Sequence, residues 1–216
     1  MAPVSPSLEA IQTLAAWLSP AYPVGSYSYS HGLEWEVDTG RVASGAALSA
    51  WIEDVLRHGA GRTDAMLLAA AWRADDPAPV AELAEALAPS AERHLETMAQ
   101  GAAFARTTSA AWDIAVAAAP YPVAVGAAAR ARGLPLPLTA TLYLQAFAAA
   151  LVSAGVRLIP LGQTDGQRIT RALLPLAASL ADAALAAPPE ALGGSAVAAD
   201  IAAMRHETQY SRLYRS

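Results

Sequence analysis

Apolar residues recur every three or four positions along most of this chain, and this spacing restricts its fold more than any other feature. Leu8, Ile11 and Leu18 show it near the start, and Leu48, Trp51, Ile52, Val55 and Leu56 repeat it. Such spacing places apolar side chains on one face of an α-helix. Alanine, which loses no side-chain entropy in a helix, fills much of the remaining sequence. Because alternating strand patterns are almost absent, we predict an all-α, single-domain bundle of roughly eight to ten helices over residues 1–216.

Capping and breaking residues predict where these helices begin and end. Pro20 should end the first helix, and Ser44 should cap a helix that stops at Gly59 and Gly61. Thr164 and Gln167 have the spacing of a capping box, and Pro175 should kink or divide the helix that follows. The other expected helices cover approximately residues 32–37, 64–73, 80–87, 90–112, 122–133 and 196–204.

Residues 133–156 carry no charge, which raises two alternatives. About twenty apolar residues can span a bilayer, so a small helical membrane protein is one hypothesis. However, Pro135 and Pro137 interrupt the start of the stretch, and Gln145 lies within it. A helix that is apolar all round can also be the buried centre of a bundle. We favour the buried helix and expect no membrane association.

The composition favours a protein that is covered by partners. Hydrophobic residues make up 55% of the 216 residues and charged residues only 15%, so we expect apolar surface that a second copy or another protein covers, with a homodimer as the simplest form. The net charge of −5 argues against non-specific nucleic-acid binding. The chain has no cysteine and its first residues lack the pattern of a signal peptide, so we expect a cytoplasmic location.

Catalytic motifs are missing from the sequence. All fourteen basic residues are arginine, which excludes a phosphate-binding loop with its lysine and a Schiff-base lysine. The run from His206 to Tyr210 begins like a helical zinc-protease motif but lacks the second histidine. We therefore expect a non-enzymatic protein with no catalytic residues and no cofactor.

One group of residues keeps an alternative open. On a helix His31, Glu34 and Asp38 would lie on one face, and an imidazole with two carboxylates could hold a borderline cation such as nickel. A metal-dependent hydrolase built on these three residues is therefore a competing hypothesis. The simpler interpretation is a solvated polar face, and we expect no resident metal.

Two blocks contain almost no alanine and are the candidate functional regions. Residues 18–40 hold only Ala21, and residues 205–216 hold none. In the second block Tyr210, Leu213 and Tyr214 have helical spacing, so we expect one short apolar stripe. One and a half turns are not stable alone. We therefore expect residues 205–216 to be mobile in the free protein and to fold on a partner.

The same blocks carry a resemblance to a known family. The run Ala21-Tyr-Pro-Val-Gly-Ser-Tyr-Ser-Tyr-Ser-His-Gly-Leu-Glu-Trp35 and the ending Arg205-His-Glu-Thr-Gln-Tyr-Ser-Arg-Leu-Tyr-Arg-Ser216 resemble the urease accessory protein family UreF. Gly101–Arg106 and Gly155–Gln163 are also similar to this family. The matches follow the family's order along the whole chain.

This resemblance implies an all-helical cytoplasmic dimer that binds UreD (UreH in some species) and the GTPase UreG. In that complex the family assists GTP-dependent nickel insertion into apo-urease. The family's C-terminal tail is part of the contact with UreD, which maps onto the end of this chain. The partner-binding candidates are therefore Tyr210, Ser211, Arg212, Leu213, Tyr214, Arg215 and Ser216 in the tail, with Tyr27, His31 and Glu34 in the opening block.

Overall fold

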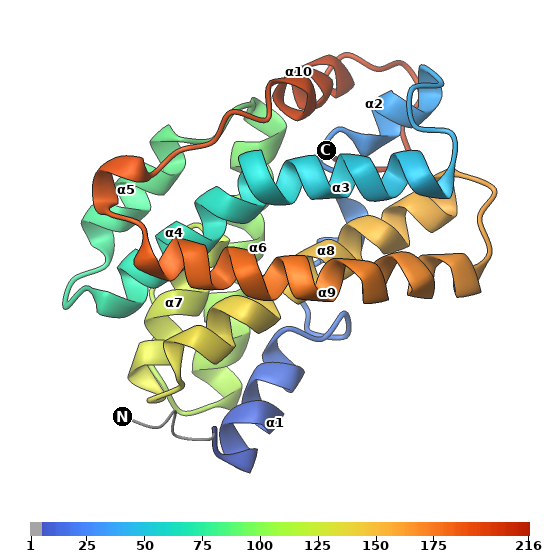
Figure 1. The fold of residues 1–216 in the computed structure, drawn as a ribbon. Coiled ribbons are helices and arrows are strands. Elements are labelled where there is room, and N and C mark those ends of the chain that lie inside the picture. Colours follow the sequence, from blue (N-terminus) through green and yellow to red (C-terminus); the bar gives the residue numbers. More distant parts are fainter. Residues whose placement is uncertain (1–5) are drawn as a thin grey trace.

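The computed structural model describes residues 6–216 and confirms the all-α prediction. No strand occurs in this range (Figure 1). The helices are α1 (Leu8–Trp17), α2 (Leu33–Asp38), α3 (Gly45–His58), α4 (Ala60–Arg73), α5 (Ala78–Ala86), α6 (Ala91–Ala111), α7 (Tyr121–Ala131), α8 (Leu136–Leu158), α9 (Gln163–Ala186) and α10 (Val197–His206). Two 3-10 turns, η1 (Ser26–Ser28) and η2 (Pro189–Ala191), lie in the connections.

Serine caps fix the starts of three helices. The hydroxyl of Ser44 accepts a hydrogen bond from the amide of Ala47 at 3.2 Å, and Ser90 accepts one from Arg93 at 3.2 Å. Ser7 caps α1 in the same way. These bonds satisfy amides that have no partner within the helix. The cap that the sequence predicts at Ser44 is confirmed, and Ser90 caps the helix expected over residues 90–112.

Two predicted boundaries are wrong, and one of the two alternatives for Pro175 is excluded. The capping box at Thr164 does not form, because α9 begins at Gln163 with Gly162 before it and Thr164 lies inside its first turn. Pro175 does not divide α9, which continues to Ala186. Gly61 does not end a helix either: it lies inside α4, where a Cβ atom would come within 2.7 Å of the Leu56 Cα. The missing side chain thus allows α3 and α4 to meet at a tight corner.

The uncharged stretch forms α8, which runs through the bundle beside α9 and also contacts α2, α3, α4 and α7 (Figure 1). Its inner face includes the buried side chains of Leu144 and Leu151. By length and composition α8 and α9 are two helices that could cross a membrane, a test that core helices of soluble proteins also pass. In this structure α8 has the position that the buried-helix prediction requires.

Gly101 provides a close approach between α6 and the chain that leads into α7. A Cβ atom at this position would overlap the carbonyl oxygen of Ala119 and lie 2.9 Å from the amide nitrogen of Tyr121. The neighbour is the segment before α7, whose backbone needs the space that glycine leaves.

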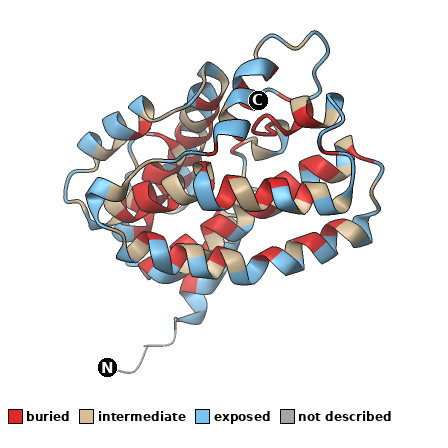
Figure 2. Ribbon diagram, turned by 45° about the horizontal axis from the view of Figure 1, so that its top comes forward, coloured by how far each residue is buried: buried red, intermediate tan, exposed pale blue. Residues whose placement is uncertain are grey.

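Aromatic side chains connect α1 to the rest of the bundle. Trp17 is fully buried and meets the rings of Phe104 and Trp112 edge to face, at 5.5 and 5.7 Å between centroids. Exposed residues cover the outer sides of the helices, whereas buried residues line the inner sides (Figure 2). The C-terminal end of the chain lies among the helices, beside α2 (Figure 1).

Candidate partner-binding site

The segment that follows α10 lies against the bundle. The carbonyl oxygen of Ser216 accepts hydrogen bonds from the amide of Ser30 at 2.6 Å and from its hydroxyl. The amide of Arg215 donates to the carbonyl oxygen of Ser28 at 2.8 Å. Tyr214 and Ser216 are buried. The last residues therefore run beside residues 28–30, almost two hundred positions earlier in the chain.

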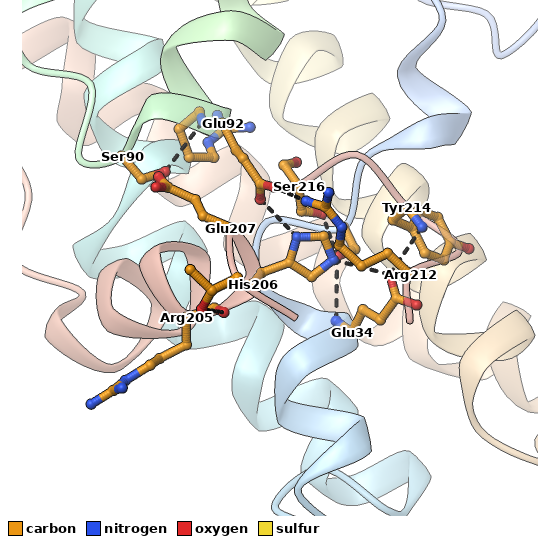
Figure 3. Close-up of polar contacts among 12 residues, drawn as sticks. Glu34, Ser90, Glu92, Arg205, His206, Glu207, Arg212, Tyr214 and Ser216 are labelled. Atoms are coloured by element: carbon orange, nitrogen blue, oxygen red, sulfur yellow. Dashed lines mark hydrogen bonds and ion pairs between the residues drawn. The ribbon is translucent and has the colours of Figure 1, made fainter. Parts of the chain in front are cut away.

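Glu34 in α2 holds this segment from below (Figure 3). One carboxylate oxygen accepts a hydrogen bond from the amide of Leu213 at 2.7 Å, and the other accepts one from the amide of Tyr214 at 2.9 Å. The second oxygen also lies 3.0 Å from Nε2 of His206. Glu34 is only 6% exposed. A buried carboxylate needs such donors, so the tail and Glu34 depend on each other.

His206, at the end of α10, connects Glu34 to α6. Its Nδ1 lies 2.7 Å from Oε2 of Glu92, and its side chain is fully buried (Figure 3). Both ring nitrogens thus face carboxylates, and only the imidazolium form can donate from both. Arg212 donates to the other Glu92 oxygen at 2.6 Å. We define the tail anchor as Glu34, Glu92, His206 and Arg212.

A second buried cluster, centred on Glu96 of α6, receives the end of the tail. The hydroxyl of Ser216 donates to Glu96 at 2.8 Å, and the side-chain amide of Gln100 donates at 2.9 Å. Arg93 pairs with the same carboxylate, and Nε2 of His31 lies 3.1 Å from it. Burial alone would raise the pKa of Glu96, but the charge of Arg93 and the His31 contact outweigh it and lower this pKa to about 2.

This shift predicts how the Glu96→Gln substitution depends on pH. The folded-state pKa is below the usual 4.5, so the stability that the carboxylate adds is present above about pH 4.5 and is lost as the pH falls towards 2. We expect Glu96→Gln to cost about 2–4 kcal/mol near pH 7, because Arg93 stays buried without its counter-ion. Urea denaturation at several pH values measures this cost.

The cost of Glu96→Gln should shrink below pH 4. Glu53→Gln is the control, because Glu53 lies in an ion pair whose two side chains are about half exposed, 3.9 Å from Arg57, and such pairs contribute little. If Glu96→Gln lowers the free energy of unfolding by the same amount at pH 7 and pH 3, the pKa of Glu96 is not lowered in the folded protein.

The structure does not bring His31, Glu34 and Asp38 together, so the predicted three-residue face is wrong. His31 and Gly32 have left-handed backbone angles, with φ of 56° and 78°, and α2 starts only at Leu33. His31 consequently turns to Glu96 and Glu34 turns to the tail. In the part of the chain that the structure describes, no group of three His, Asp or Glu side chains is placed to hold a metal ion.

The predicted tail stripe is also wrong, because the three apolar residues point in different directions. Tyr210 is fully exposed and Leu213 is 79% exposed, whereas Tyr214 is buried. No helix includes them, since α10 ends at His206. The segment is instead hydrogen-bonded to Glu34 and Ser30 within the chain, an arrangement that the expected mobile tail does not include. Among the other candidates, Ser211, Arg212 and Arg215 are exposed, and Tyr27 is 67% exposed.

The sequence reasoning missed the residues that receive the tail. No sequence motif marks Glu92, Arg93 and Glu96, which lie outside both alanine-poor blocks. Ser30 and His206 lie within those blocks, but nothing in the sequence indicates that they contact the tail or a carboxylate. One signal was present: Glu92, Arg93 and Glu96 lie close together near the start of a long helix, in a chain with only 15% charged residues. Their role depends on a contact with the distant C-terminus, which no local pattern contains.

Apolar side chains also face solvent on α10. Val197, Ile201 and Met204 occur at helical spacing and are 62%, 50% and 51% exposed. They lie on the helix that leads into the tail, whose Tyr210 and Leu213 are exposed as well. The C-terminal part of the chain thus combines buried ionic anchors with apolar groups in water, an arrangement typical of a protein-binding surface.

Fold and site together describe an all-α bundle that fixes its own C-terminal segment. The family model described as UreF matches residues 42–174. A urease accessory protein UreF of Cereibacter sphaeroides is 52% identical over 207 residues, covering 96% of this chain and 99% of the relative. One from Ruegeria pomeroyi is 49% identical over 215 residues, covering 98% and 99%. The chain therefore belongs to the UreF family, as the resemblance of its two alanine-poor blocks indicated.

Proposed function

We propose that this protein is a cytoplasmic, non-enzymatic scaffold for urease maturation. In this proposal it forms a homodimer and binds UreD (UreH) and the GTPase UreG, and the complex inserts nickel into apo-urease with GTP hydrolysis. The support is membership of a family whose members are called urease accessory proteins. The C-terminal surface described above is the candidate contact with UreD.

The observation that carries the proposal is the way in which the tail is held. The amides of Leu213 and Tyr214 are fixed on Glu34, while the side chains of Tyr210 and Leu213 extend into solvent. A backbone fixed in advance reduces the entropy lost on binding. The anchored tail therefore supports a role as a preformed binding element, which replaces the folding-on-contact mechanism that the sequence suggested.

The proposal assigns the chemistry of nucleotide hydrolysis to the partner. With no lysine in its sequence, this chain lacks the side chain that a phosphate-binding loop places on the β- and γ-phosphates. Its own contribution is to position UreG and UreD relative to each other. The apolar groups of α10 and the tail would be covered in the assembled complex.

Truncation of Leu213 tests the proposed surface. We expect Leu213→Ala to lower the affinity for the partners about thirtyfold, because an apolar anchor at an interface centre contributes about 2 kcal/mol. Less UreD and UreG should therefore be recovered on co-purification. The side chain of Leu213 is in solvent, so the melting temperature of the isolated protein should not change. Co-expression, affinity capture and urease activation are the measurements.

Leu95→Ala is the matched control for this test. Leu95 on α6 is 62% exposed, so its replacement removes the same apolar side chain from a different surface. It should leave partner recovery and urease activation unchanged. If Leu213→Ala and Leu95→Ala recover the partners equally well, the tail is not the interface.

A further inference from the structure

A cavity of about 480 Å³ lies between α1, the loop of residues 19–31, α6 and α8, and it borders the Glu96 cluster that receives the end of the tail. Its walls are mainly apolar and include Leu14 from α1 and Leu18 directly after it, with Phe147 and Ala150 from α8. Pockets that hold small organic molecules have this size and this mixture of apolar walls with a few polar groups. Nothing in the proposed scaffold role uses this cavity.

Asp64 lines the cavity without an ion-pair partner in the described residues. Arg93 and Glu96 line it and pair with each other. Asp64 of α4 also lines it, and the hydroxyl of Tyr143, at 2.8 Å, is the hydrogen-bond donor that the structure gives this carboxylate. Burial lowers the pKa of His31, and Arg93 lowers it further, so His31 stays neutral. The charged lining groups also include Arg157, which donates to Ser153 and lies over the Tyr214 ring. With Asp64 ionised the four charges balance, but Arg93 pairs with Glu96 and Asp64 forms no ion pair in the described residues.

Aromatic rings surround the same space. Tyr121 and Tyr143 line the cavity with ring centroids 5.6 Å apart, and Phe147 meets the His31 ring edge to face at 4.8 Å. The faces of such rings attract cations, most strongly where water is excluded. A partly buried carboxylate with aromatic neighbours is therefore complementary to a positively charged group.

We propose that this cavity binds a small organic amine, whose ammonium group pairs with Asp64 and whose apolar body lies between α1 and α8. An anionic ligand would meet both Asp64 and Glu96, and a neutral ligand would leave the Asp64 charge without a counter-ion. Direct cation binding by a metal is disfavoured by the donor set, since no three ligating side chains converge in the described residues. The inference goes beyond the proposed scaffold role, which assigns no small ligand to this chain.

The probe is 2-phenylethylamine, with 2-phenylethanol as the neutral analogue and 3-phenylpropionate as the anionic one. Binding to the full chain is measured by titration calorimetry and by ligand-observed nuclear magnetic resonance at about pH 7.5. We expect the amine to bind at least about tenfold more tightly than the alcohol, and the propionate not to bind. Equal binding of amine and alcohol, or no binding of the amine, would overturn the proposal.

Lowering the pH provides a second test. Burial raises the pKa of Asp64 to about 6, although Arg93 and the Tyr143 hydrogen bond oppose this shift. The groups that face Asp64 are Arg93 and Glu96 from α6, Tyr143 from α8, Tyr121 from α7 and His31 before α2. Asp64 gains a proton between pH 7.5 and pH 5, so amine affinity should fall about tenfold while alcohol affinity stays constant.

Asp64→Asn removes the charge and keeps the shape, so this variant should bind the amine no better than the alcohol at any pH. Because a partly buried charge without an ion-pair partner is removed, its melting temperature at pH 7.5 should equal or exceed that of the unmodified protein. Asp182→Asn is the control, because Asp182 is exposed on α9; it should bind the amine normally. If Asp64→Asn binds the amine with unchanged affinity, the proposal fails.

Discussion

Replacing Glu34 with alanine is expected to lower the free energy of unfolding by about 3–5 kcal/mol and to detach the tail. Without the Glu34 carboxylate, Glu92 is the remaining carboxylate beside the buried His206. The amides of Leu213 and Tyr214 also lose their hydrogen-bond acceptor. Unpaired buried donors cost about 1–3 kcal/mol each. Thermal melting should show the loss, and hydrogen exchange at the amides of residues 213–216 should accelerate.

The same variant should abolish recovery of UreD and UreG, because the proposed surface needs an ordered tail. Asp38→Ala is the matched control: Asp38 ends the same helix but makes no interaction with the tail in the structure. It should melt and bind partners like the unmodified protein. Slow exchange at residues 213–216 in Glu34→Ala would show that Glu34 does not hold the tail, and the assigned role of the tail anchor would be wrong.

Gly101→Ala is expected to destabilise the protein by about 2–4 kcal/mol although it adds only one methyl group. That methyl group overlaps the carbonyl oxygen of Ala119, which is backbone and cannot rotate away. Extra volume in a packed region typically costs 1–3 kcal/mol, and here α6 and the segment before α7 must separate. Urea denaturation should show a lower midpoint.

Gly45→Ala provides the comparison. Gly45 is also helical, at the start of α3, but an added Cβ would be in ordinary contact, 3.7 Å from Ile169. Removing glycine from a helix stabilises it by about 0.5–1 kcal/mol, so this variant should be as stable as the unmodified protein or slightly more stable. Equal stability of the two variants would show that the close approach at Gly101 is relaxed in solution.

The local features of the fold were predictable because their causes are local. Helical spacing depends on residues three or four positions apart, and the caps at Ser44 and Ser90 each depend on an amide three residues later. The predicted cap at Thr164 does not form. Its sequence allows a capping box, but α9 had already begun at Gln163, and a sequence pattern cannot show which of two neighbouring starts packs better.

The candidate site was predictable only as two regions. Residues 18–40 and 205–216 stood out because they lack alanine, and both contribute to the site. The contact between these two regions could not be read from the sequence. The sequence predicted a solvated polar face in the first block, with a metal face as the alternative, and a mobile apolar stripe in the second. The structure instead joins the two blocks to each other through Glu34, Ser30 and the tail backbone.

The amino-acid sequence by itself determined the helical class, most helix starts and ends, and the family of the chain, and it favoured a central place in the bundle for the uncharged residues 133–156. Tertiary structure alone decided the direction of each functional side chain. The reason is that a buried carboxylate accepts hydrogen bonds from the donors that the packing of the helices places next to it. For Glu34 these are His206 and two amides about 180 residues away, and that choice is made when α2, α6 and α10 pack together.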